Sequence, residues 1–189
     1  VETDGLCADL VVKGICDKLE DVTTVVMPRI WCSRSNEHIE FPGTVFLEHE
    51  TFVRLVMDIC ASVARAGFKR MVILNWHGGN TALLASIVRD IRQEFGLLIF
   101  VVDGLNLLST FKPSWFEEGS FDIHAEHLET SMLQARHPGL VKDIDFSDLG
   151  SDLKRGKMAK AFKGYKYLIP EGGPVLMGWM THDLSEDGV

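Results

Sequence analysis

The chain has 189 residues, 46% of them hydrophobic, which supports one full core and predicts a single domain over residues 1–189. Its formal net charge of -8 at pH 7, without a Lys/Arg cluster, argues against nucleic acid as a partner. No apolar run approaches the roughly 20 residues that cross a bilayer, so we expect no membrane partner and a cytoplasmic location.

The first predicted element is a helix that starts near Asp4. Thr3-Asp4-Gly5 precedes apolar residues at helical spacing, and a carboxylate at such a position ordinarily caps a helix. The β-branched run over 23–30 predicts a strand, and the polar stretch over 33–40 predicts a loop.

A long amphipathic helix is predicted over 48–66, after the turn signal at 41–43. Its apolar face consists of Phe52, Leu55, Val56, Ile59, Val63 and Ala66. Gly67 is expected to close this helix, because glycine adopts the left-handed conformation of a helix C-terminus at little cost.

The segment 70–80 combines a strand, a turn and a helix start. The apolar run from Met71 to Leu74 predicts a strand covered on both faces and ended by Asn75. Gly78 and Gly79 allow backbone angles and close approaches that other residues forbid. This is therefore an abrupt turn directly after a buried strand.

His77 lies in this turn, and Asn80 is placed to cap the helix predicted over 81–95. The histidine is thereby set at the carboxyl end of a strand, which is the rim where open α/β sheets bind ligands. A lone histidine in such a turn more often caps or packs, so its partners decide the interpretation.

Another strand, again expected to be buried on both faces, is predicted over 97–102. Strands and helices thus alternate at short spacing, which is typical of a parallel sheet with helices on both faces. The predicted fold class is α/β, with three α/β/α layers around a mostly parallel central sheet.

The irregular, aromatic stretch over 106–121 is typical of a lid or binding loop. The segment from Asp122 to Ser131 is predicted to open a helix that ends at Pro138. Its expected core stripe is Leu128, Met132 and Ala135. Beyond it, only Trp179 to Asp183 predicts an element, a last strand at the rim.

Three groups of side chains suggest a metal site, namely Asp4, His77 and the cluster His124, Glu126, His127 and Glu129. Carboxylates and imidazoles without a CxxC thiolate pair suit a hard or borderline divalent ion such as Zn, Mn or Fe. The four cluster residues alternate between two faces of a helix, so not all of them reach one ion. The cluster by itself equally fits a solvated helix start with acids near the positive dipole end.

Taken together, the motifs resemble those of the creatininase family, the creatinine amidohydrolases and their relatives. The matching segments are Thr3-Asp4, Glu37-His38 with Phe41-Pro42-Gly43-Thr44, Asn75-x-His77-Gly78-Gly79-Asn80, His124-Ala125-x-x-x-Glu129-Thr130-Ser131, and Asp183-Leu184 with Gly188-Val189. They occur in the family's order and cover nearly the whole chain. The pair of His-Gly-Gly-Asn and His-Ala-x-x-x-Glu-Thr-Ser is the specific part of the resemblance.

The resemblance implies a creatininase-like hydrolase in which two divalent metal ions act on a cyclic amide or related carbon–nitrogen bond of a small-molecule substrate. It implies that Asp4 bridges the ions, that His77 is a ligand, and that Glu129 is a ligand or the general base. It places His124 beside the substrate and His38 on the substrate side as well. Relatives are homo-oligomers, often hexamers, so we expect a homo-oligomer here.

Two further chemical needs are met by candidate residues. A general acid or base, Glu129 or His124, carries the proton to the leaving nitrogen, which departs poorly as an anion. Backbone N–H groups at Gly78 and Gly79 are free to meet the developing oxyanion. The alternative is that these glycines serve only packing.

Two departures from the family pattern affect these expectations. The family carries a Glu-x-His pair of metal ligands shortly before the Thr-Asp, so we expect an N-terminal segment with these ligands to be missing from residues 1–189. Creatininase has a Glu where Gly79 stands here, and tryptophans near the substrate where this chain offers Phe121. Creatinine is therefore not the expected substrate.

Other enzyme classes lack their motifs in this sequence. A serine esterase needs a Gly-x-Ser-x-Gly elbow, and a nucleotide-binding module needs Gly-x-Gly-x-x-Gly or a Walker loop; none of them occurs. The alternatives that remain are a catalytically silent, oligomeric member of the fold, and a hydrolase of a cyclic keto-sugar or lactone.

Overall fold

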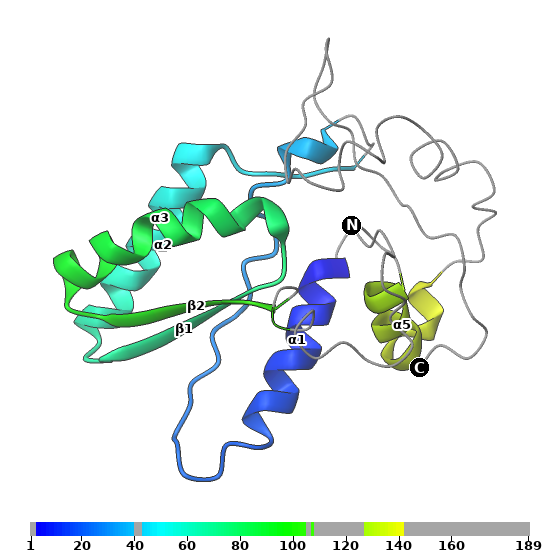
Figure 1. Ribbon diagram of the computed structural model, residues 1–189, viewed down its shortest axis with the longest axis horizontal. Helices are drawn as coiled ribbons and strands as arrows, with labels where there is room; N and C mark the ends of the chain where they lie inside the picture. Colours follow the sequence, from blue (N-terminus) through cyan, green and yellow to red (C-terminus); the bar gives the residue numbers. More distant parts are fainter. Residues whose placement is uncertain (1–2, 40–42, 105–106, 108–126, 142–189) are drawn as a thin grey trace. The chain divides into compact units, whose positions relative to one another are not determined.

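A computed structural model describes residues 3–39, 43–104, 107 and 127–141 of the chain (Figure 1). The chain divides into two compact units. The first comprises Glu2–Asn36 and Val45–Pro113, and the second comprises Val1, Glu37–Thr44 and Ser114–Val189. The single domain expected from the sequence stays a prediction.

The first unit contains a parallel pair of strands with helices on both sides. Its elements are α1 (Thr3–Cys16), α2 (His49–Arg65), β1 (Arg70–Asn75), α3 (Gly78–Phe95) and β2 (Leu98–Asp103). The two strands pair in parallel, from Arg70 opposite Leu98 to Asn75 opposite Asp103. Helices α2 and α3 lie on one side of the strands, and α1 lies on the other and contacts β1 (Figure 1). The predicted α/β fold with a parallel sheet is confirmed.

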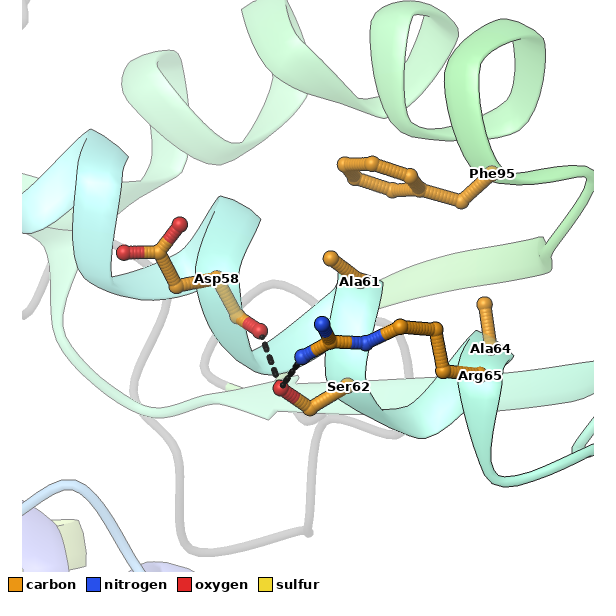
Figure 2. A pocket seen from close by; sticks show the side chains of 6 residues that line it. All are labelled: Asp58, Ala61, Ser62, Ala64, Arg65 and Phe95. Carbon is orange, nitrogen blue, oxygen red and sulfur yellow. Dashed lines mark hydrogen bonds between the residues drawn. The ribbon is translucent and has the colours of Figure 1, made fainter.

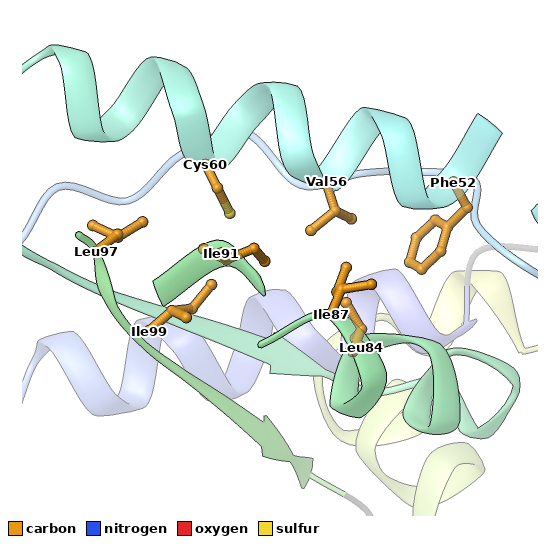
Figure 3. Packing of buried hydrophobic residues seen from close by; sticks show 8 residues of the cluster. All are labelled: Phe52, Val56, Cys60, Leu84, Ile87, Ile91, Leu97 and Ile99. Atoms are coloured by element: carbon orange, nitrogen blue, oxygen red, sulfur yellow. The ribbon is translucent and has the colours of Figure 1, made fainter. Parts of the chain in front are cut away.

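The core of this unit lies between α2, α3 and the strands (Figure 3). Its buried members are Phe52, Val56, Cys60, Leu84, Ile87, Ile91, Leu97 and Ile99. Side chains four apart on α2 and three or four apart on α3 fall on one face of each helix, which is why these positions meet. Burying each large aliphatic side chain contributes about 1.5–3 kcal/mol before entropy is counted.

Glycines end both helices that cover the core. Gly67 follows α2 with φ 94°, and Gly96 follows α3 with φ 61°. The N–H of Gly96 donates to the carbonyl of Arg92 at 3.1 Å. The predicted closure of α2 at Gly67 is therefore confirmed, and each left-handed glycine turns the chain directly into a strand.

The face of the strands opposite α2 and α3 is only partly covered in the part of the chain that the structure describes. Ile99 is fully buried against the helices, whereas Val72 and Phe100, opposite each other on the other face, are 64% and 50% exposed. The expectation of doubly buried strands is wrong for these residues. An apolar run predicts a strand with apolar side chains on both faces, but it does not predict how much of each face a neighbouring element covers.

The strand predicted over 23–30 does not form in the described residues. This segment has no ladder partner there, and Val25 and Val26 are 66% and 59% exposed. A β-branched run favours extended backbone, but a strand also needs a neighbour with which to exchange hydrogen bonds. This prediction is corrected.

The second unit contains α5 (His127–Arg136) and the short η2 (Pro138–Leu140), and η1 (Asn36–His38) runs into this unit from the first. Helix α5 ends before Pro138, as predicted. Among the α5 side chains that the structure describes, Glu129, Thr130 and Leu133 are buried, Met132 is half-buried and Ala135 is exposed. The side chain of Leu128, the first residue of the predicted stripe, lies outside the described part. The predicted apolar stripe is thus wrong at Ala135, because α5 buries a face that carries polar groups.

The aromatic stretch over 106–121 and the last predicted strand at 179–183 fall outside the described residues, apart from Leu107. None of the helices within the described part is long and apolar enough to cross a membrane.

Candidate functional site

His77 and Asp4, two of the predicted metal-binding residues, lie in contact. His77 lies two residues after Asn75, the last residue of β1, and Asp4 belongs to the first turn of α1. Their side chains meet at 2.8 Å between Nδ1 of the imidazole and Oδ2 of the carboxylate. The fold therefore brings together a carboxylate and an imidazole that are 73 positions apart in the sequence.

The second ring nitrogen of His77 is held by the loop at 34–35. Nε2 lies 2.8 Å from the backbone carbonyl oxygen of Arg34 and 3.3 Å from Oγ of Ser35. A carbonyl oxygen only accepts, so Nε2 carries the proton in this contact. In a neutral ring the lone pair is then on Nδ1, directed at the carboxylate of Asp4.

This pair of groups fits a cation. A ring lone pair and a carboxylate oxygen that face each other need a positive species between them, which is either a proton or a metal ion. Metal-binding histidines usually donate their other ring N–H to a carbonyl or carboxylate, as His77 does here. The imidazole side chain is 8% exposed and that of Asp4 38% exposed, so solvent reaches the pair from the side of Asp4.

A buried amide network supports the turn that carries His77. The Asn75 side chain donates to the carbonyl of His77 at 2.9 Å, and its Oδ1 accepts from the N–H of His77 at 3.3 Å. It also donates to Oγ1 of Thr81 at 3.1 Å, and that hydroxyl donates to Asp103 at 2.6 Å. The rim ends of β1 and β2 are thus tied to the start of α3.

Asn80 does not cap a helix. Helix α3 begins at Gly78, with His77 at the N-cap position. The Asn80 side chain is 7% exposed and bonds to Ser33, Arg34 and Asn75 instead. The predicted cap is therefore wrong, because the amide holds the neighbouring loop and is not directed at the N-terminus of α3.

Gly78 and Gly79 form the start of α3 with ordinary backbone angles. Among the described residues, positive φ angles occur at Gly43, Gly67 and Gly96, so the unusual angles predicted for the turn are absent. A Cβ added at Gly78 would meet nothing within 4 Å. The N–H groups of a first helical turn have no intrahelical partner, so both remain placed to bind an anionic or oxyanionic group.

Trp76 is a residue at the site that the sequence analysis missed. Its ring is 4% exposed, and within the described part of the chain its buried Nε1 has no hydrogen-bond partner. It packs so closely on Gly104 that a Cβ there would lie 2.3 Å from ring atom Cε3. The sequence signals that could have identified this contact are the position of Trp76 directly before His77 and the glycine directly after β2.

The other predicted site residues belong to the second unit. Nε2 of His38 lies 3.8 Å from Oε1 of Glu37, and the carbonyl of His38 accepts from Thr44 Oγ1 at 2.8 Å. Glu129 is 7% exposed on α5, next to Thr130, which is fully buried. His124 lies outside the described residues.

Within the described ranges, no three His, Cys, Asp or Glu side chains are grouped closely enough to hold a metal ion. Asp4 and His77 are two predicted ligands that the fold brings into contact, and their role in metal binding stays a prediction.

A hollow of about 430 Å³ lies elsewhere, lined by Asp58, Ala61, Ser62, Ala64, Arg65 and Phe95 (Figure 2). Arg65 donates to Oγ of Ser62 at 3.1 Å, and that hydroxyl donates to the carbonyl of Asp58 at 2.8 Å. It is formed where α2 and α3 lead into the amino ends of the strands, whereas His77 follows the carboxyl end of β1. None of its residues was a predicted site residue.

Comparison with known proteins gives one family. A family model described as Creatininase, creatinine amidohydrolase, matches residues 1–189. The creatinine amidohydrolase of Pseudomonas putida is 28% identical over 152 residues, which cover 70% of this chain and 57% of the relative. The mycofactocin precursor peptide peptidase of Mycobacterium ulcerans is 29% identical over 149 residues, which cover 75% of this chain and 53% of the relative. The chain thus spans little more than half the length of these relatives.

A solved structure agrees with this family. It is a type II creatininase with one tryptophan-to-phenylalanine substitution, and it superposes with a TM-score of 0.55 at 26% sequence identity. The match covers 75% of this chain and 60% of that chain. The fold described here is therefore creatininase-like.

Proposed function

The chain belongs to the creatininase family, and on this premise we propose that it is a metal-dependent hydrolase of a carbon–nitrogen bond in a small cyclic or formyl amide. The observation that carries the proposal is the contact between Asp4 and His77 at 2.8 Å. The two relatives described above are named as an amidohydrolase and a peptidase, and cleavage of a carbon–nitrogen bond is common to both activities.

The proposed cofactors are two divalent ions per subunit, Zn, Mn or Fe, with Asp4 and His77 as ligands and Glu129 as a further ligand or as the general base. An oxygen donor and a nitrogen donor without thiolates suit these ions. When bound, such ions lower the pKa of water and polarise the substrate carbonyl. The Asp4–His77 pair supports this assignment because the imidazole is already oriented by the carbonyl of Arg34.

The chain's own residues would supply the remaining chemistry. Glu129, buried on α5, would carry the proton to the leaving nitrogen, which departs poorly as an anion. His124 and His38 would contact the substrate. The N–H groups of Gly78 and Gly79 would donate to the carbonyl oxygen as negative charge develops on it.

The substrate is proposed from the chemistry that such a site requires. A polarised carbonyl attacked by activated water is a feature of cyclic amides, formamides and lactones alike. Gly79 stands where creatininase carries a Glu, which argues against creatinine itself. The alternatives are a hydrolase of a cyclic keto-sugar or lactone, and an oligomeric family member without catalytic activity.

The experiment is a turnover screen of cyclic amides, formamides and lactones with the full-length, metal-loaded protein. We expect hydrolysis of at least one amide class, and Glu129→Gln should lower its turnover by roughly 10² or more. Glu50→Gln, at an exposed carboxylate in the first turn of α2, is the matched control and should leave turnover unchanged. Hydrolysis of none of these compounds by the metal-loaded protein would favour the silent alternative.

A further inference from the structure

We infer that Asn80 is a positioning residue that selects Nδ1 of His77 as the metal-binding nitrogen. The inference rests on the proposed metal site and adds a role for a residue that binds neither metal nor substrate. It is carried by a continuous set of hydrogen bonds that runs from Asn80 through Arg34 to the imidazole.

The orientation of the Asn80 amide follows from its partners. The backbone N–H of Arg34 lies 3.1 Å from Oδ1 of Asn80, and because an N–H only donates, this atom is the oxygen. The amide nitrogen then donates to Oγ of Ser33 at 3.1 Å and to Oδ1 of Asn75 at 3.2 Å. Because the amide has three hydrogen-bond partners and is 7% exposed, its orientation is fixed.

Arg34 transmits this arrangement to the histidine. Its N–H is held by Asn80, and its carbonyl oxygen accepts from Nε2 of His77 at 2.8 Å. The loop has other fixed points, since the carbonyl of Ser33 accepts from the N–H of Leu47 at 2.8 Å. Asn80 bonds to two consecutive residues of this loop, which places the Arg34 carbonyl opposite the ring.

The consequence concerns which ring nitrogen is available. While the Arg34 carbonyl accepts from Nε2, the lone pair of a neutral ring is on Nδ1, towards Asp4. Without that acceptor, His77 can adopt the other tautomer and other ring orientations. Metal binding must then restore the tautomer and orientation that direct Nδ1 towards Asp4, which lowers the affinity for the metal. Loss of such a supporting partner typically weakens metal affinity about 10–100-fold.

The test uses the full-length protein and Zn²⁺ alone as the probe. The dissociation constant is measured by competition with a chromogenic chelator for the wild type, Asn80→Ala and the control Ser86→Ala. Ser86 also lies on α3, but it is exposed and its hydroxyl donates only to the carbonyl of Leu83. We expect Asn80→Ala to raise the dissociation constant about 10–100-fold and Ser86→Ala to leave it unchanged.

A second readout reports the ring directly. In the Zn²⁺-loaded protein labelled with ¹⁵N-histidine, two-bond ¹H–¹⁵N correlations identify the metal-bound and the protonated nitrogen of His77. The wild type should show metal on Nδ1 and a slowly exchanging proton on Nε2, and Asn80→Ala should lose that slow exchange. Metal on Nε2 of the wild type would overturn the inference.

The outcomes separate this inference from the proposed function. A wild-type protein that binds no Zn²⁺ contradicts the proposed metal site itself. A wild type that binds Zn²⁺ with an affinity unaffected by Asn80→Ala contradicts only the role of Asn80. If Asn80→Ala does not fold, Ser33→Ala removes a single bond to Asn80 and should weaken Zn²⁺ binding in the same direction; no weakening then overturns the inference.

Discussion

Replacement of Gly104 by alanine should destabilise the fold through Trp76. The added Cβ would lie 2.3 Å from Cε3 and 2.5 Å from Cζ3 of the indole, far inside carbon–carbon contact distance. The ring is 4% exposed and rigid, so it has no flexible end that can move aside. Overpacking of a buried site costs about 1–3 kcal/mol, and we expect the upper half of this range.

The assay is urea unfolding and thermal melting of the full-length protein. A loss of about 2–3 kcal/mol corresponds to a fall in melting temperature of roughly 4–12 °C for a chain of this size. Gly14→Ala is the matched control, because Gly14 is an exposed helical residue of α1 with nothing within 4 Å of an added Cβ. That variant should gain about 0.5–1 kcal/mol.

A double variant tests the assigned cause. Trp76→Phe removes the part of the indole that the new methyl group meets, so Gly104→Ala should cost less in that background. The clash is refuted if Gly104→Ala unfolds at the wild-type urea concentration, or if its cost is the same with Trp76→Phe.

Three further predictions follow from the core and the assembly. Ile91→Ala should lower the free energy of unfolding in urea by about 2–5 kcal/mol, because Ile91 is fully buried. Gln93→Ala, at an exposed position of the same helix, should cost almost nothing. Equal effects of the two variants would contradict the packing in Figure 3. Burial raises the pKa of the Cys60 thiol above 9.0. As pH rises, the unfolded chain therefore loses this proton before the folded protein does. The wild type should lose more stability than Cys60→Ala when pH is raised through 9.0. Parallel curves of unfolding free energy against pH for the two proteins would refute this. Light scattering at micromolar concentration should report the homo-oligomer expected from the family resemblance, and a stable monomer would contradict that expectation.

The sequence predicted those elements of the fold whose formation is determined by the residues of one segment alone. The amphipathic pattern of α2, the glycine that closes it and the apolar run of β1 are local signals, and each was placed within a few residues. The run over 23–30 carried an equally local signal but forms no strand in the described part, because pairing depends on a neighbour that the run itself does not specify.

The candidate site was predicted only in part, for a similar reason. Asp4 and His77 were identified by residue type and position, and the fold brings them together. The partner of Nε2 is a backbone carbonyl, which every residue carries, so no side-chain pattern points to Arg34. Asn80 was assigned to a helix cap because its local sequence favours one, whereas its amide is used by a loop more than 40 positions earlier.

The most direct test of the central claim is the metal content of the full-length protein, measured by elemental analysis after purification. The wild type should hold two divalent ions per subunit, and Asp4→Ala and His77→Ala should each reduce this content. Asp9→Ala is the matched control, since Asp9 lies on the same helix and pairs with Arg29; its metal content should equal that of the wild type. Unchanged metal content in both Asp4→Ala and His77→Ala would contradict the account.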